Sequence, residues 1–148
     1  MSESGQLSKL YRQIKMMIGV GRVTGSNDGG TVQTVQYQTP LEVRDDTPRL
    51  AEFGFSSGLP ANTDVVIGFL GGDRSSAVII GSNHQSFRHT GLNTGETVIY
   101  SQWGQYVKLT ETGIIIEANG QPVTVNNATE VTINASEKVR LNTPLLEV

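Results

Sequence analysis

The chain opens with apolar side chains spaced like one face of a helix. They recur at intervals of three and four residues: Leu7, Leu10, Tyr11, Ile14, Met17 and Ile18. Such spacing places them on one stripe, and Ser4 is a suitable N-cap. We therefore predict a short amphipathic helix within residues 1–20.

After residue 20 the pattern changes to short β-strands separated by turn residues. The expected strands are 22–24, 31–37, 65–70 and 77–81. Turns are expected at Asn27 to Gly30 and at Gly71 to Arg74, and a polar connection bounded by Pro40 and Pro48 separates the two pairs. Short strands of this kind predict a small oligonucleotide-binding-type (OB-type) or Greek-key barrel over residues 21–95.

A second set of strands follows the predicted barrel. Segments 98–101, 106–109 and 114–117 are rich in β-branched and aromatic residues, with turns at Trp103-Gly104 and at Glu111 to Gly113. We assign residues 96–118 to a β-meander that joins the barrel to the rest of the chain.

Residues 119–148 contain an internal repeat. An apolar, polar, apolar triplet recurs every eight residues at 123–125, 131–133 and 139–141, and 146–148 continues it one residue early. Since side chains alternate across a strand, one face collects all the apolar residues. These are Val123, Val125, Val131, Ile133, Val139, Leu141, Leu146 and Val148.

A lone chain cannot cover this apolar face with strands so short. Stacked repeats need neighbours to exclude water, and three copies wound around one axis would bring these side chains together. The fold class we predict is therefore all-β: a short helix, an OB-type barrel and a C-terminal intertwined triple-stranded β-helix formed by a homotrimer. The shaft would run over residues 119–148, with the last repeat incomplete.

Composition narrows the function. The chain has 148 residues, a net charge of −3 and no cysteine. Its eleven Lys and Arg are scattered, which disfavours specific nucleic-acid binding, and the lack of cysteine excludes disulfides and thiolate metal sites. No apolar stretch approaches the ~20 residues of a membrane span, and no secretory signal opens the sequence, so we expect a product made in the cytoplasm.

Several segments resemble the phage-Mu-type baseplate spike family, also called baseplate assembly protein V. The resemblance lies in 53–57 (FGFSS), 65–75 (VVIGFLGGDRS), 95–100 (GETVIY), 104–109 (GQYVKL) and 112–114 (TGI), preceded by Gly21-Arg22-Val23. These segments occur in order along nearly the whole chain.

The resemblance implies a homotrimer at the centre of a contractile-tail baseplate, in a phage virion or a tail-like particle. Its partners would be a hub protein above, a separate tip protein below as one alternative for the apex, and transiently the bacterial outer membrane that it pierces. Family members commonly hold iron at their apex through a His-x-His pair. That pair is absent here, where the histidines are His84 and His89, so we predict no cofactor.

Two aromatic residues and the helical stripe are assigned structural roles. Trp103 and Tyr106 are expected to pack the junction between barrel and shaft. The stripe residues of the helix are expected to dock onto the barrel or onto the hub rather than onto a membrane. The docking residues are Leu7, Leu10, Tyr11, Ile14 and Ile18.

No catalytic site is predicted. Gly71 to Ser75 lacks the Lys of a phosphate-binding loop and is expected to be a turn. His84 and His89 are assigned to a solvated loop. The acidic residues Glu42, Asp45, Asp46 and Glu52 are assigned to a solvated connection, although such a cluster could also suggest a glycosidase pair.

Two alternatives compete with the spike. The first is a single-strand nucleic-acid-binding barrel, since OB-type barrels often bind oligonucleotides. The second is a spike associated with a cell-wall hydrolase, although 148 residues leave no room for an inserted enzyme domain.

Overall fold

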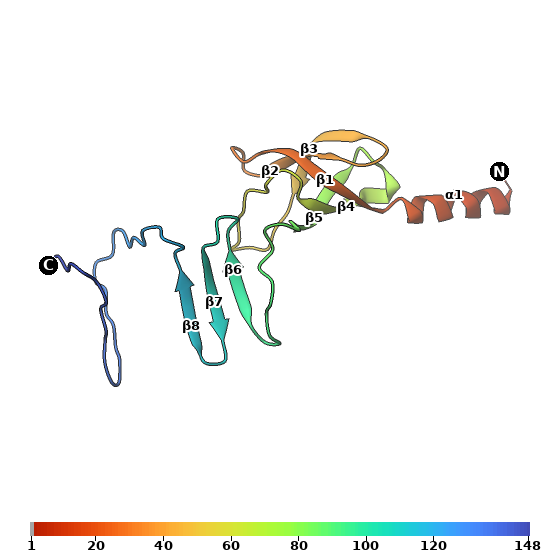
Figure 1. The fold of residues 1–148 in the computed structure, drawn as a ribbon. Helices are drawn as coiled ribbons and strands as arrows, with labels where there is room; N and C mark the ends of the chain where they lie inside the picture. Colours follow the sequence, from red (N-terminus) through yellow and green to blue (C-terminus); the bar gives the residue numbers. More distant parts are fainter. Residues whose placement is uncertain (1) are drawn as a thin grey trace.

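The computed structural model describes residues 2–148 and shows an elongated chain whose termini lie at opposite ends (Figure 1). One helix projects from one side of a barrel, and a small sheet and an extended C-terminal segment lie on the other side. The elements are α1 (Glu3–Lys15), β1 (Ile18–Asn27), β2 (Gln33–Gln38), β3 (Val43–Arg49), β4 (Asp64–Phe69), η1 (Leu70–Gly72), β5 (Ala77–Asn83), β6 (Thr97–Tyr100), β7 (Tyr106–Thr110) and β8 (Gly113–Glu117).

The predicted N-terminal helix is confirmed, but both of its ends differ from the prediction. Ser2 is the N-cap instead of Ser4, and its hydroxyl accepts a hydrogen bond from the backbone N–H of Gly5 at 3.2 Å. The helix ends at Lys15, and Ile18 already pairs with Gly68 in the sheet. The apolar stripe therefore continues in sequence beyond the helix, because barrel pairing overrides the helical period there.

The five strands β1 to β5 close into a barrel in the order β1-β2-β3-β5-β4. All neighbours pair antiparallel except β3 and β5, which pair in parallel where Arg49 meets Ile79. The barrel interior is filled by Val23, Val35, Tyr37, Val65, Ile67, Phe69 and Ile79, each at most 2% exposed. The predicted small barrel is confirmed, and it has one strand more than the four expected at 22–24, 31–37, 65–70 and 77–81.

The assignment of residues 40–48 to a polar connection is wrong, because β3 occupies residues 43 to 49. This strand shows no apolar alternation, since only Thr47 is buried. An irregularity in the pairing between Val35 and Tyr37 accommodates the acidic pair, and Asp46 has a positive φ of 51°. Polar side chains and a bulge thus conceal a barrel strand.

The second predicted set of strands is confirmed as a three-stranded antiparallel sheet in the order β6-β7-β8. Tyr100 opposes Tyr106 next to the first turn, and Thr110 opposes Gly113 next to the second. Beyond β8, residues 118–148 follow an extended path away from the barrel and contain no helix or strand within the single chain (Figure 1). The intertwined triple-stranded β-helix therefore stays a prediction.

Candidate subunit interface

One face of the β6-β7-β8 sheet is an uncovered apolar surface. Ile99, Val107 and Ile116 form one cross-strand row, and Leu109 and Ile114 belong to the next row on the same face. Their exposed fractions lie between 38% for Val107 and 71% for Ile114. We call these five residues the sheet patch.

The opposite face of the same sheet is partly covered by the chain itself. The segment between β5 and β6 lies against it, where the His89 ring contacts the Tyr106 ring edge-on at 4.7 Å between centroids. Glu96 of this segment also forms an ion pair with Lys108, whose Nζ lies 3.8 Å from Glu96 Oε1. The sheet thus has one face that the chain covers and one that it leaves open.

The C-terminal triplets continue the exposed apolar surface. All eight residues predicted to line the shaft are exposed, with fractions from 57% at Val139 to 72% at Val125 before the terminal residue. Leu145, which the repeat pattern did not include, is also 70% exposed. The side-chain hydrogen bonds within the triplet region are local, such as Thr132 to Glu130 and Leu145 to Thr143.

An apolar surface of this extent needs a covering partner. Full burial of one aliphatic side chain contributes about 1.5–3 kcal/mol, so the sheet patch and the triplets together represent tens of kcal/mol of gross stabilisation on association. Many exposed apolar side chains on one face are typical of an interaction site. We therefore treat this surface as a candidate subunit interface.

The predicted junction residues lie where the sheet meets the C-terminal segment. Asn119 follows β8 and donates a hydrogen bond from Nδ2 to the carbonyl oxygen of Trp103 at 2.8 Å. A Cβ on Gly104 would lie 2.8 Å from that same amide, so the turn and the start of the segment are in tight contact. The Trp103 side chain itself is 68% exposed, while Tyr106 is half-buried against His89.

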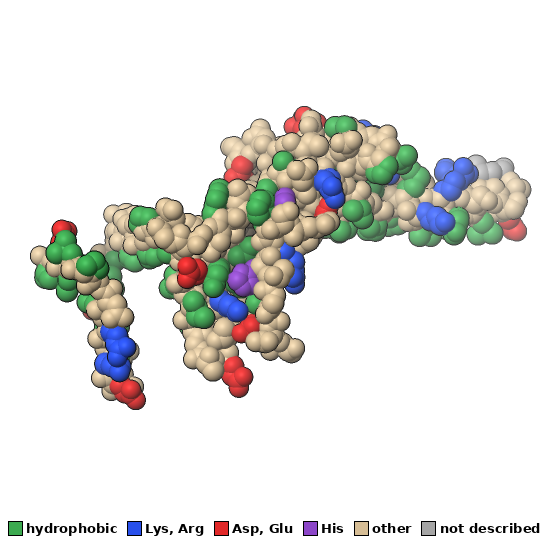
Figure 2. Space-filling view, in the orientation of Figure 1, with side chains coloured by type: hydrophobic (Ala, Val, Ile, Leu, Met, Phe, Trp, Pro, Cys, Tyr) green, Lys and Arg blue, Asp and Glu red, His purple; other side chains and the backbone are tan. Residues whose placement is uncertain are grey.

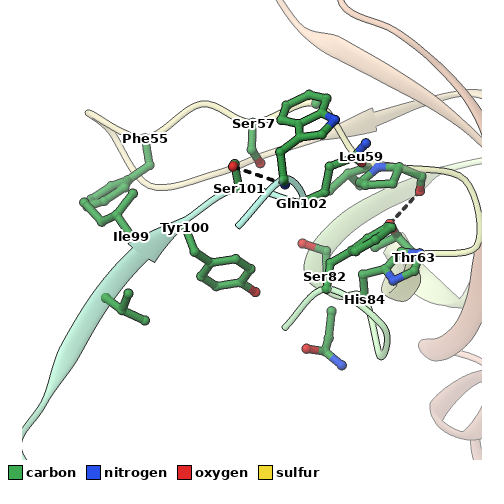
Figure 3. Close-up of a pocket in the computed structure, with 16 residues that line it drawn as sticks. Phe55, Ser57, Leu59, Thr63, Ser82, His84, Ile99, Tyr100, Ser101 and Gln102 are labelled. Atoms are coloured by element: carbon green, nitrogen blue, oxygen red, sulfur yellow. Dashed lines mark hydrogen bonds between the residues drawn. The ribbon is translucent and has the colours of Figure 1, made fainter. Parts of the chain in front are cut away.

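A groove of about 590 Å³ separates the barrel from the sheet (Figure 3). Phe55 and Leu59 from the loop before β4 line one part of it, and Ile99 and Tyr100 of β6 line another. Trp103 also contributes to its wall. The groove is mostly apolar and holds no cluster of charged groups.

The two histidines are structural loop residues in this arrangement. His84 Nδ1 accepts from the backbone N–H of Ser86 at 3.2 Å, so its Nε2 carries the proton and donates to the carbonyl of Ala61 at 3.1 Å. Its ring stacks on Phe87 with centroids 4.3 Å apart. His89 contacts Tyr106, so the two imidazoles have different neighbours.

No metal centre is assembled from the side chains of residues 2–148. No group of three or more His, Cys, Asp or Glu residues is close enough to hold an ion in this part of the chain. His84 and His89 lie before β6, far along the chain from the triplets. The residues present therefore do not fit the apical iron site that the family resemblance implies.

Glu42 does not behave as a catalytic acid. Its two carboxylate oxygens accept hydrogen bonds from Arg74 Nε at 2.6 Å and from Arg44 Nε at 2.7 Å. These arginines, Arg74 foremost, hold the pKa of Glu42 below its ordinary value. A glycosidase acid needs a raised pKa, so this group has the opposite electrostatics.

The arginines of the barrel are engaged by partners rather than forming an open cationic stripe. Arg22 pairs with Asp64 at 3.1 Å, and Arg44 and Arg74 share Glu42. Arg49 donates to a serine of the loop before β4. Single-strand binding requires a positively charged groove with stacking aromatics, and this arrangement disfavours it.

Helix α1 leaves its predicted docking residues exposed. No residue of α1 is buried, and the helix meets the barrel at the turn η1, where a Cβ on Gly72 would lie 2.9 Å from the Gln13 carbonyl. Hydrophobic side chains follow one side of the helix (Figure 2). Docking of the stripe onto its own barrel does not occur in the single chain. No helix among residues 2–148 has the length and apolarity to span a membrane.

Fold and surface together define a β-rich protein with a closed barrel, a three-stranded sheet and an exposed apolar face. The family comparison agrees: residues 21–86 match the family model described as Bacteriophage Mu Gp45, N-terminal. This region belongs to the phage Mu Gp45 family.

Two curated relatives extend the match past the barrel. The chain is 30% identical over 109 residues to the baseplate puncturing device gp45 of Escherichia phage Mu, covering 72% of this chain and 55% of the relative. It is also 30% identical over 108 residues to the Mu-like prophage FluMu protein gp45 of Haemophilus influenzae, covering 72% of this chain and 59% of the relative. The matched region thus spans little more than half the length of these relatives.

The sheet patch is the part of the interface that the sequence interpretation missed. The sequence predicts a junction for residues 96–118, and its pattern does not single out the five patch residues as an interface. Strict alternation at Val107, Leu109, Ile114 and Ile116 was the available signal. The signal was ambiguous because Ile115 lies on the other face, so β8 reads as a continuous apolar run.

Proposed function

We propose that this protein is the central spike of a contractile-tail baseplate, a homotrimer that transmits force to the bacterial outer membrane. The observation that carries the proposal is the exposure of the apolar side chains of the sheet patch and of the C-terminal triplets. The homology to the Mu baseplate puncturing device supports the same role.

Three copies suit this surface because each chain offers one apolar face. In a threefold arrangement the inward triplet side chains of all copies meet on the axis, while Thr124, Thr132, Arg140 and Glu147 face water. Interleaved strands would also satisfy the backbone groups that find no ladder partner in the single chain. The product is a stiff column with few free edges.

The proposed role is mechanical and needs no catalytic chemistry in this chain. Contraction of a sheath would supply the driving force, and the spike would only have to resist buckling and unfolding. The barrels would form a collar around the upper end of the column. The protein would be located in the tail baseplate of a virion or of a related tail-like particle.

The exposed stripe of α1 is the proposed contact to a hub protein above the collar. The last turn of the helix touches its own barrel at Gly72, whereas Leu7, Leu10 and Tyr11 are exposed and can enter an interface. An isolated helix of 13 residues is marginal in water, so a docking partner would stabilise it. At the opposite end, a separate tip protein is a further proposed partner.

The trimeric shaft is tested by placing a charge on its proposed axis. Ile133→Asp or Leu141→Asp would introduce three carboxylates at one level of a dry core, and we expect complete loss of the trimer. The measurement is molar mass by light scattering. Thr124→Asp is the matched control on the opposite face and should leave the trimer mass unchanged. A trimer that persists in both core variants would contradict the proposal.

A further inference from the structure

The loop between β3 and β4 presents a fully exposed aromatic side chain at its tip. Phe53 is 103% exposed, more than any other aromatic residue of the described chain. Phe55, two residues further, is 63% exposed and forms part of the groove between barrel and sheet. Neither ring belongs to the barrel core, and the proposed shaft makes no use of them.

The loop is held in a defined shape at its base. Arg49, at the end of β3, donates from Nη1 to the Ser57 carbonyl at 2.7 Å and from Nη2 to Ser57 Oγ at 2.8 Å. Gln33 of β2 joins the same network, accepting from Arg49 at 2.9 Å and donating to the Ser57 carbonyl at 3.0 Å. These hydrogen bonds hold Arg49, at the start of the loop, close to Ser57.

The tip is ordered by its own backbone. The N–H of Phe55 donates to the carbonyl of Glu52 at 3.1 Å, and Gly54 between them has a φ of 92°, which favours glycine. A turn therefore projects Phe53 outward. Because the backbone that carries Phe53 is already ordered, little backbone entropy is lost on binding, which favours Phe53 as an anchor residue at an interface.

The groove between the barrel and the sheet has an apolar lining that suits an aromatic side chain such as Phe53. The groove of about 590 Å³ is lined by apolar and aromatic groups that include Leu59, Phe87, Tyr100 and Trp103. Phe53 is not among the residues that line it, so the chain does not fill its groove with its own loop tip. Figure 3 shows Phe55 and Ile99 close together at one end, so the groove is continuous with the sheet patch.

We propose that Phe53 of each copy inserts into the groove of the neighbouring copy. The anchor is not among the residues that line the groove, so the contact between two copies is heterologous, and three such contacts close a ring around a threefold axis. A second copy is the occupant that these observations favour, because each chain supplies one anchor and one groove, and because the groove includes Ile99 of the proposed trimer interface. This inference rests on the proposed trimer and adds a lock between the collar barrels.

Cross-linking tests the contact directly, because the chain contains no cysteine. Cysteines introduced together by Phe53→Cys and Gln102→Cys, where Gln102 lines the groove, should be joined between subunits by oxidation or a short bismaleimide. The expected product is a covalent trimer on a denaturing gel. Each single-cysteine variant, treated in the same way, should give no covalent trimer.

A substitution at the anchor provides the second measurement. Phe53→Ala should lower the melting temperature of the trimer by about 5 °C or more, since it removes three aromatic contacts. Leu41→Ala is the matched control, because Leu41 is 82% exposed in the loop between β2 and β3.

The outcomes separate this inference from the proposed function. A trimer that gives no covalent product in the double variant and whose melting temperature is unchanged by Phe53→Ala would overturn the lock and leave the spike intact. A disulfide confined to single chains would overturn the lock as well. A monomeric native protein would overturn both.

Discussion

The barrel and the C-terminal half of this chain solve the problem of burying apolar side chains in opposite ways. The barrel encloses seven hydrophobic residues that are at most 2% exposed, all between Val23 and Ile79. From β6 to Val148, the described chain buries no hydrophobic residue, although it contains more Val, Ile and Leu per strand. One region carries its own core, whereas the other leaves its apolar side chains exposed in the single chain.

This difference has a thermodynamic consequence. Stability of the barrel is a property of one chain, but stability of the proposed shaft depends on the concentration of chains, because association is part of its folding. Unfolding of the native protein should therefore be separable into a step that depends on protein concentration and one that does not.

The largest effect on association is expected from a charge on the sheet patch. Ile116→Asp should abolish the trimer while the barrel stays folded, because the residue lies 66% exposed on the open face of β8. Ile115→Asp is the matched control, on the same strand and the opposite face beside Lys108. Light scattering and near-ultraviolet circular dichroism give the two readouts. Equal effects of the two substitutions would contradict the assignment of faces.

A cavity in the barrel core should destabilise the barrel of each chain rather than the association of chains. Ile67→Ala removes a fully buried side chain and should destabilise the barrel by about 2–5 kcal/mol, measured by urea denaturation. The matched exposed substitution is Ile80→Ala, at 56% exposure, which should cost far less. A small effect of Ile67→Ala would show that the barrel does not depend on its own core.

Overpacking the barrel should have a somewhat smaller effect. A Cβ at Gly21 would lie 3.1 Å from Tyr37 Cδ2 and 3.2 Å from Ile67 Cδ1, so Gly21→Ala must displace two core side chains. We expect a loss of about 1–3 kcal/mol in urea denaturation. Gly25→Ala, in the same strand but with no atom within 4 Å of the new Cβ, is the control and should be nearly neutral.

The smallest expected effect concerns the two arginines around Glu42. Because Arg74 and Arg44 lower the pKa of Glu42 in the folded state, their stabilisation is fully present above the pKa of the unfolded chain and is lost as pH falls through the lower folded value. Glu42→Gln should therefore cost about 1 kcal/mol at pH 7 and less at pH 4. Thermal unfolding at both pH values tests this, and a cost that grows toward low pH would contradict the sign.

The sequence predicts best those strands whose apolar residues are buried within the single chain. The apolar runs of β4 and β5 and the turn after Phe69 follow directly from their composition, and a small barrel follows from the succession of short strands. Strand β3 was missed because Thr47 is its only buried residue and four of its seven residues are charged. Tertiary pairing on both edges of β3, rather than its own pattern, makes it a strand.

The candidate interface was predicted in one half and missed in the other. The octad triplets can be recognised in the sequence as a repeat. Because no other segment of the chain is available to cover their apolar face, the repeat predicts a partner outside the chain. The sheet patch has no repeat, and its open face can be recognised only once the register places Ile99, Val107 and Ile116 in one row. The ordered Phe53 loop depends on Gln33 of β2 as well as on Arg49 at the end of β3. The sequence of the loop alone therefore does not reveal that the loop is ordered.

The central claim is that the exposed Val, Ile and Leu side chains of the C-terminal half are covered by two further copies of the same chain. Sedimentation equilibrium of the purified 148-residue chain tests it most directly. The account predicts a single species of three chain masses that persists on dilution through the micromolar range. A stable, soluble species of one chain mass at the same concentrations would contradict it.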